Sequence, residues 1–506
     1  MSTQLTGSSQ AISLGEGYAL RAPGVHGSAD LKHPRSSDER ARSRSADDGT
    51  EALDTALRAA NITEVRQIDL TLQPTKPADA TRSLRSVDGQ EMLELHVPDL
   101  GPDCGQLVLA CNETGVLTWH LPIDDKQQVQ PPASRGSGGV KRFLIPATQP
   151  KPAPVGAGQR SLLGVFGKKL LKILVYPVLD PVIGAIGEYF AEKWEEKKRP
   201  YVLRDFSPAN FRNPTVPALA ASDWQRLSTG RALLFVHGTS STAHAAFSQI
   251  PDETFKKLHQ RYGGRVFAFN HFTLSQDPCR NIEWMLQQLP TGVNLEIDIV
   301  CHSRGGLVAR TLAEQPSVFD LNTTRIKVNR VVFVAVPNHG TPLVDPDHIV
   351  KMIDRLTSAL NLFPTGPVVE ALEALIMVIK VIGHGALKSL DGLAAMKPTG
   401  KFLNKLNSGI PTGSQYYAIA ANYGPTNQGL KALLTGAADG VIDMVFKEAA
   451  NDWVVPEEGV YSVIANNNAF PIQLSQLYLI PPSEGVMHTT MFGHPPVSQL
   501  LDKWLV

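Results

Sequence analysis

The spacing of hydrophobic residues divides the chain near residue 230. Beyond this point, continuous apolar runs alternate with stretches in which apolar residues recur at helical spacing. Short continuous apolar runs are typical of strands buried on both faces, and strands separated by helices favour a mostly parallel sheet with helices on both sides. We therefore predict an α/β domain over residues 229–506. Its predicted strands lie at 232–236, 265–270, 293–301, 330–336, 416–421 and 477–480.

The first 228 residues show weaker patterns. Residues 1–58 are rich in Ser, Gly, Arg and Asp, and they carry too little apolar surface to offset the entropy of ordering, so we predict that they are disordered. Apolar and polar residues alternate in short runs between residues 59 and 130, which predicts a small β-rich module. Residues 131–160 are rich in Pro, Gly, Ala and Ser and are typical of a linker.

Two further segments are strongly apolar. Residues 161–228 combine apolar stretches with charges and prolines, which predicts a helical connector. Residues 345–398 insert a helical region into the α/β domain, and we predict that they form a cap. The cap is either a lid that binds an acyl chain and excludes water on closing, or simply a buried element. Residues 161–198 and the cap are also candidates for peripheral membrane contact.

A candidate nucleophile stands at the end of the predicted strand 293–301. In the run Cys301-His302-Ser303-Arg304-Gly305, the serine lies between that strand and a helix-compatible stretch. This is a relaxed form of the G-x-S-x-G elbow, whose sharp turn projects the serine hydroxyl away from the sheet. Gly305 provides the small residue that the turn needs, whereas Cys301 is larger than the usual glycine. The alternative is an ordinary glycine-containing loop, so the assignment depends on the rest of the chain.

A serine hydroxyl needs a histidine as base, and with this type of elbow the base follows the serine in the chain. His488 lies between the last predicted strand and a terminal helix over residues 498–505. It would therefore stand at the carboxyl end of the sheet, where α/β folds place their sites. We predict that His488 is the base, with His494 as the alternative.

The site also needs an acid that orients the histidine and donors that stabilise an oxyanion. Asp452, in a turn before a short apolar run, is the predicted acid, and Asp443 and Asp439 are the alternatives. The predicted oxyanion donors are two backbone amides, that of Arg304 directly after the serine and that of Thr239 in the loop after the first strand.

These pieces together resemble the α/β-hydrolases of the lipase and esterase group. The matching pieces are Phe235–Thr239, Cys301–Arg310, Val336–Leu343, Asn451–Pro456 and His488. Residues 230–506 are close in pattern to bacterial triacylglycerol lipases and to the hydrolase domain that removes acyl chains from lipid-anchor inositol. The resemblance implies an α/β-hydrolase fold in which Ser303 is the nucleophile, Asp452 the acid and His488 the base. It leaves about 230 N-terminal residues unmatched.

Composition narrows the possible partners. The 48 basic and 48 acidic side chains cancel, so no global field would attract nucleic acid, and we expect no nucleic-acid partner. The sequence contains no zinc motif, phosphate loop or dinucleotide fingerprint, so it implies no metal and no cofactor. Four cysteines are too few for a disulfide scaffold, although a bridge between Cys104 and Cys111 stays open. Without a visible signal peptide or spanning segment, we expect a cytoplasmic location, with signal-independent export as the alternative.

The predicted function is that of a lipase-like serine carboxylic ester hydrolase. It would cleave a lipid or another acyl ester through an acyl-enzyme on Ser303. Two alternatives remain open. The same triad would serve an acyltransferase or a thioesterase, or the domain would be a noncatalytic hydrolase-like scaffold whose N-terminal module binds a partner.

Overall fold

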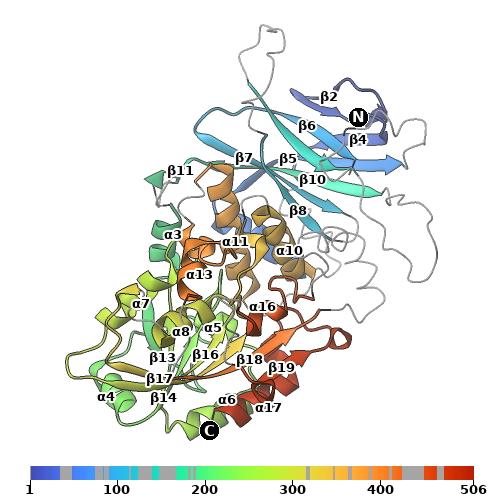
Figure 1. Ribbon diagram of the computed structural model, residues 1–506. Coiled ribbons are helices and arrows are strands. Elements are labelled where there is room, and N and C mark those ends of the chain that lie inside the picture. Colours follow the sequence, from blue (N-terminus) through green and yellow to red (C-terminus); the bar gives the residue numbers. More distant parts are fainter. Residues whose placement is uncertain are drawn as a thin grey trace.

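The chain forms an N-terminal β-rich module and a C-terminal α/β domain, with a pair of cap helices between them (Figure 1). The computed structural model describes residues 2–34, 48–73, 84, 91–112, 115–123, 139–147, 167–180, 184–185, 190–314, 319–345, 348–362, 367–386, 390–408, 413–423, 450–463 and 472–505. Within these residues, no helix combines the length and the apolar character needed to cross a membrane. All four cysteines are free thiols.

A seven-stranded sheet forms the centre of the α/β domain, in the order β13-β15-β14-β16-β17-β18-β19. The edge strand β13 runs antiparallel to β15, and the other neighbours are parallel. The strands are β13 (Val202–Asp205), β14 (Ala232–Val236), β15 (Val266–Asn270), β16 (Leu295–His302), β17 (Ile326–Val334), β18 (Gln415–Ala421) and β19 (Leu477–Ile480). The predicted mostly parallel sheet is confirmed, but its edge strand β13 lies before residue 229. The sequence does not reveal β13, because the strand has only four residues and ends in Arg204 and Asp205.

Helices cover both faces of this sheet, because successive side chains of the buried strands point to opposite sides. Leu234 of β14 packs into one hydrophobic cluster with residues of α7 (Pro278–Gln287) and α8 (Gly305–Glu314). Its neighbour Phe235 packs into a second cluster with residues of α6 (Asp252–Arg261) and α17 (Pro495–Trp504). Further helices of the domain are α3 (Phe190–Lys198), α4 (Ala221–Ser228), α5 (Ala243–Ala246), α13 (Lys401–Leu406) and α16 (Glu458–Tyr461).

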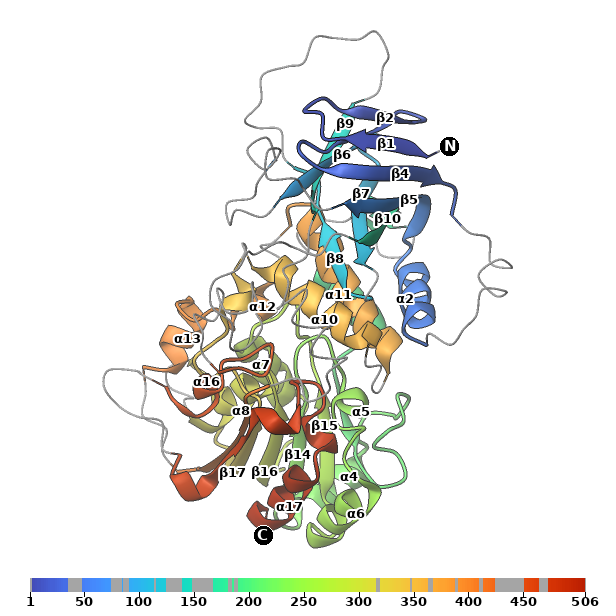
Figure 2. The ribbon, with the colours of Figure 1, turned by 90° about the vertical axis from the view of Figure 1, so that its right-hand side faces the viewer.

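The N-terminal module is a sandwich of two antiparallel sheets around its own apolar core, seen in Figure 2 above the cap. One sheet has the order β1-β4-β5-β10-β7-β8 and the other the order β2-β3-β6-β9. The strands are β1 (Thr3–Thr6), β2 (Ile12–Gly15), β3 (Tyr18–Arg21), β4 (His26–Lys32), β5 (Thr63–Gln73), β6 (Met92–Pro98), β7 (Cys104–Asn112), β8 (Leu117–His120), β9 (Val140–Pro146) and β10 (Lys168–Pro177). A small hairpin of β11 (Leu179–Asp180) and β12 (Gly184–Ala185) follows.

The prediction that residues 1–58 are disordered is wrong for most of this segment. Four strands occupy residues 3–32, and α2 (Asp48–Ala59) packs into a hydrophobic cluster with residues of β7, β8 and the cap. The apolar residues here are few, but the buried ones of the strand region, such as Leu5, Leu20 and Val25, contribute to the sandwich core. A count of apolar residues therefore underestimates short strands that bury only one face.

The predicted linker over 131–160 and the predicted helical connector over 161–228 are also corrected, because each contains a strand of the sandwich. β9 lies in the first, and β10 lies in the second, where it pairs with both β5 and β7. The lysines of β10 interrupt its apolar pattern, so the sequence does not indicate a strand there. Lys172 forms ion pairs with Asp54 and Glu64 from distant parts of the chain, at 3.1 and 3.4 Å.

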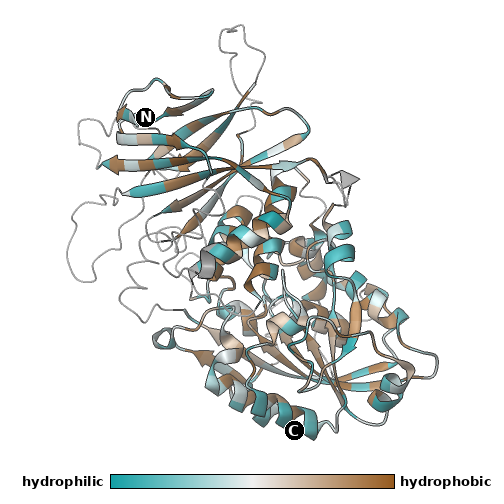
Figure 3. Ribbon diagram, turned by 180° about the vertical axis from the view of Figure 1, so that it is seen from behind, coloured by the Kyte–Doolittle hydropathy of each residue, from teal (hydrophilic) through white to brown (hydrophobic). Residues whose placement is uncertain are grey.

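The predicted cap over residues 345–398 is helical, as expected. It consists of α10 (Ile349–Leu362), α11 (Val368–Gly383) and the short α12 (Asp391–Ala394). Buried residues of α10 and α11 belong to one hydrophobic cluster that also includes residues of β8, α2 and α8. In Figure 3 apolar residues continue from the sandwich through the central helices into the α/β domain. The apolar side chains of the cap are therefore buried within the protein.

Candidate active site

Ser303 lies in a strained turn between β16 and α8. Its φ of 52° falls in the left-handed region, which non-glycine residues rarely adopt, and its amide donates a hydrogen bond to the carbonyl of Val334 at 2.9 Å. Such strain at a serine between a strand and a helix is characteristic of a nucleophile elbow. The side chain is buried, with 5% of its residue surface exposed.

The chain passes so close to this turn that two neighbouring positions need glycine. A Cβ atom on Gly305 would lie 2.4 Å from the carbonyl oxygen of Val236, and one on Gly238 would lie 2.6 Å from Cβ of Ser303. The larger Cys301 is accommodated differently, since its side chain is buried beside the sheet and its Sγ lies 3.3 Å from the carbonyl oxygen of Val332. Burial raises the pKa of the Cys301 thiol well above its usual value, so the thiol stays protonated.

His488 and Asp452 form a buried pair. Nδ1 of His488 lies 2.8 Å from Oδ2 of Asp452, and the amide of His488 donates to the carbonyl of Asp452 at 3.1 Å. The other carboxylate oxygen, Oδ1, accepts hydrogen bonds from the amides of Val454 and Val455 at 3.0 and 2.7 Å. Because a carboxylate only accepts, this contact assigns the proton to Nδ1 and leaves Nε2 free to act as a base.

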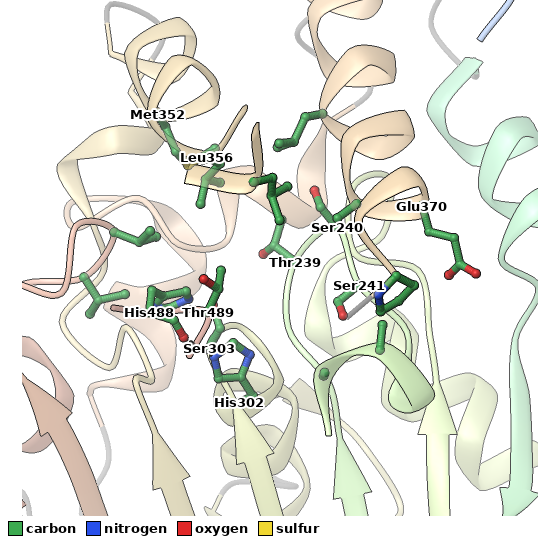
Figure 4. Close-up of a pocket in the computed structure, with 18 of the residues that line it drawn as sticks. Thr239, Ser240, Ser241, His302, Ser303, Met352, Leu356, Glu370, His488 and Thr489 are labelled. Atoms are coloured by element: carbon green, nitrogen blue, oxygen red, sulfur yellow. Dashed lines mark hydrogen bonds between the residues drawn. The ribbon is translucent and has the colours of Figure 1, made fainter. Parts of the chain in front are cut away.

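Ser303 and His488 line the same pocket (Figure 4). Thr239 lines it as well, and Arg304 follows Ser303 directly. Within the described residues, neither the Thr239 amide nor the Arg304 amide donates a hydrogen bond to the protein. Both amides are therefore available for an oxygen that develops negative charge beside Ser303.

The alternative base, His494, lies apart from this arrangement. His494 directly precedes α17, and its Nε2 lies 3.1 Å from Oε2 of Glu484. It is not among the residues that line the pocket. Asp439 and Asp443 lie outside the described residues. Of the described candidates, Ser303, Asp452 and His488 are thus brought to one place.

Sequence reasoning missed the part played by His302. Its ring packs against that of His488 with 4.9 Å between centroids, and its Nε2 donates to the carbonyl oxygen of His488 at 3.0 Å. Burial, followed by the nearby His488, lowers the pKa of His302 to about 3, so that the ring stays neutral. A neutral His302 can hold the loop that carries His488 without competing with it for a proton.

The side chain of Arg304 is another feature that the sequence does not reveal, since the elbow pattern points only to its amide. The buried guanidinium donates to the carbonyl of Gly392 at 2.8 Å and to Oδ1 of Asn281 at 3.1 Å, and also to the carbonyls of Phe272 and Gln276. Burial lowers the pKa of Arg304 to about 10, which leaves it charged at neutral pH. Arg304 therefore ties the elbow to α7, to the loop after β15 and to the cap.

Glu195 of α3 holds the loop after β15 through hydrogen bonds. Its two carboxylate oxygens accept hydrogen bonds from the amides of Thr273, Leu274 and Ser275 and from two hydroxyls. The side chain is almost fully buried. Neither Glu195 nor Arg304 has a sequence signal for this role, apart from the position of Arg304 next to the serine.

We expect Arg304→Lys to lower the free energy of unfolding by about 3 kcal/mol. A lysine ammonium cannot reach the four acceptors that the planar guanidinium satisfies, so buried carbonyl oxygens would lose their partners. Urea denaturation of the variant and of Arg280→Lys measures the difference. Among the described residues, the exposed Arg280 forms one ion pair, with Glu283, and its replacement should change stability by less than about 0.5 kcal/mol. Equal effects of the two substitutions would contradict this account of Arg304.

Comparisons with known proteins agree with the boundary of the α/β domain. A family model described as "Domain of unknown function (DUF7379)" matches residues 198–506, a region that begins just before β13. No curated protein matches the chain.

Several solved structures are similar to the chain at low identity. Lipase 1 from Pelosinus fermentans is 12% identical with a TM-score of 0.35, and the match covers 54% of this chain and 98% of that one. Phospholipase PlaB from Legionella pneumophila is 14% identical with a TM-score of 0.30, over 46% of this chain and 45% of that one. A carboxylesterase structure from Nitrososphaera gargenis is 12% identical with a TM-score of 0.30, over 55% and 90%.

Proposed function

We propose that this chain, which belongs to the DUF7379 family, is a serine carboxylic ester hydrolase with a lipase-like preference for acyl esters. The observation that carries the proposal is the 2.8 Å contact between His488 and Asp452, at a pocket that also contains the strained Ser303. A buried aspartate that orients a histidine next to a serine is the arrangement that makes the hydroxyl nucleophilic.

The reaction would proceed in two halves. Oγ of Ser303 attacks the ester carbonyl carbon while Nε2 of His488 takes the hydroxyl proton, and the amides of Thr239 and Arg304 stabilise the oxyanion. Collapse of this intermediate breaks the bond to the leaving alcohol, which receives the proton from His488. Water then attacks the acyl-enzyme with the same base, and the carboxylic acid leaves. Asp452 stays ionised and keeps the imidazole in its working tautomer.

The composition of the pocket supports an acyl substrate with a medium or long chain. Most of the lining comes from apolar side chains of the cap and of neighbouring loops, and Figure 4 shows Met352 and Leu356 of α10 above the serine. The apolar lining residues are Ala245, Ala246, Met352, Leu356, Leu360, Pro367, Ala371, Leu375, Met396, Val454, Val455 and Phe492. An extended hydrocarbon chain would gain about 0.8 kcal/mol for each methylene that it buries there.

The direct test is covalent labelling with a fluorophosphonate. We expect a stable adduct on the peptide that contains Ser303, detected by mass spectrometry, and no adduct in Ser303→Ala. Replacing Ser303 removes only a hydroxyl, so the variant should unfold at the same temperature as the wild type. A folded wild-type protein that never reacts would contradict the proposal and favour a noncatalytic scaffold. Comparing esters with acyl thioesters, with and without added alcohols, would separate hydrolysis from thioester cleavage and acyl transfer.

A further inference from the structure

Two faces of the cap helix α10 make different contacts, one with the pocket and the other with the N-terminal sandwich. One face carries Met352, Leu356 and Leu360, which line the pocket above Ser303. These residues recur at four-residue spacing, so they form one stripe along the helix. The acyl-binding wall of the proposed enzyme therefore depends on where α10 is held.

The other face of α10 contacts the edge strand β8 of the N-terminal sandwich. Oδ1 of Asp354 accepts a hydrogen bond from the amide of Trp119 at 2.7 Å. Oγ of Ser358 accepts from the amide of Leu117 and donates to its carbonyl, both at 3.0 Å. The indole Nε1 of Trp119 lies 3.3 Å from Oγ1 of Thr357. Polar side chains of α10 thus satisfy the free edge of the sheet where another strand would otherwise pair.

Helix α11 is fastened to the same module. The buried Lys380 donates from Nζ to the carbonyl of Ala60 at 2.9 Å, directly after α2, where the helix dipole favours a cation. Its own carbonyl accepts from the hydroxyl of Tyr176, which belongs to β10, at 3.4 Å. Both cap helices are therefore attached to the sandwich by buried polar contacts as well as by the shared apolar core.

We propose that the N-terminal sandwich is part of the substrate-binding apparatus. Through Asp354 and Ser358, which act as positioning residues, it holds α10 as a fixed wall of the pocket and so sets the preference for long acyl chains. This inference rests on the proposed esterase function. The cap then does not act as a mobile lid, and the substrate enters the pocket without an opening step.

Helix α10 stays in place because separating it from β8 would cost free energy. Lifting the helix from β8 would leave buried amides and carbonyls of the edge strand without partners, in addition to exposing the apolar core. The protonation of Asp354 adds a test of the same contact. Burial raises its pKa to about 8, against the opposing effects of the Trp119 amide and of the nearby Arg355 and Lys351, so the carboxyl is largely neutral at pH 7. A neutral asparagine can then replace it.

The experiment compares kcat/KM for p-nitrophenyl acetate and p-nitrophenyl laurate in the full chain. We expect an acetyl group to make little contact with α10, whereas the much longer lauroyl chain should lie against the stripe of Met352, Leu356 and Leu360. We expect Asp354→Ala and Ser358→Ala to lower kcat/KM for the laurate roughly five- to tenfold, mainly through KM, and to change the acetate value less than about twofold. Asp354→Asn should restore the laurate value. Lys32→Ala, which removes an exposed ion pair to Asp69 elsewhere in the sandwich, should change neither.

A measurement on the wild type alone complements the variants. If α10 is a fixed wall, the rate should not jump as the laurate concentration passes its solubility limit, because no lid has to open at an interface. A jump of about tenfold or more would overturn the inference. So would variants that label normally with fluorophosphonate but keep the wild-type ratio of laurate to acetate activity. Failure of the wild type itself to label at Ser303 would instead defeat the proposed function, and the inference with it.

Discussion

His488→Gln is expected to lower kcat for a soluble ester by about 10⁴-fold or more while the protein stays folded. Glutamine can still hydrogen-bond to Asp452, but its amide cannot accept a proton from Ser303 or deliver one to the leaving alcohol. The loss should therefore fall on kcat, with little change in KM. Hydrolysis of p-nitrophenyl butyrate, together with a thermal unfolding curve, measures both effects.

The matched control is His494→Gln. His494 lies six residues further along the same C-terminal segment and faces Glu484 instead of the pocket. We expect its kcat to stay within about twofold of the wild type. If His494→Gln abolished activity and His488→Gln did not, the assignment of the base would be reversed.

The candidate catalytic residues can be predicted from the sequence because their types and order are restricted. The strand, turn and helix around Ser303 indicate a nucleophile elbow, and the place of His488 in the loop before the terminal helix indicates a base. The structure places both at the carboxyl ends of parallel strands and seats His488 against Asp452. The elbow turn is a local signal, and the order of serine, aspartate and histidine along the chain can be read from the sequence without knowledge of the fold.

The residues that hold the site in place carry no such signal. Arg304 finds its acceptors on three separate segments, up to 88 residues away, and Glu195 binds a loop almost 80 residues later. Nothing near either residue in the chain indicates that its charge will be buried. Only the tertiary fold supplies the partners that make burial of these charges affordable.

The N-terminal sandwich was underestimated for a related reason. β10 contains three lysines, and β1, β2 and β3 have only four residues each, so none of these strands shows the long apolar run of a central strand. Their stability comes from pairing across more than 50 residues, as between β10 and β7. The cap was placed correctly as a helical insertion, but the sequence offered no hint that α10 would be attached to the edge of another sheet.

Asp452→Asn is expected to reduce kcat by about 10⁴-fold, although the side chain keeps its size. The reason lies in the two amides that face Oδ1. Val454 and Val455 both donate to that oxygen, so the asparagine carbonyl must take its place there, and the new NH₂ group must face His488. The imidazole would then accept at Nδ1 and carry its proton on Nε2, which is the wrong tautomer for removing a proton from Ser303.

This geometry also predicts how the variant fails. Fluorophosphonate labelling of Ser303 should slow in proportion to kcat, because the serine is no longer activated, while KM and the unfolding temperature should change little, since every hydrogen bond at the Asp452 position is still made. Asp452→Ala should retain more activity than Asp452→Asn, because without an NH₂ group to oppose it the histidine can return to its working tautomer. An asparagine variant that kept more than about a tenth of the wild-type kcat would show that Asp452 does not orient the base, and the acid would then have to come from elsewhere in the chain.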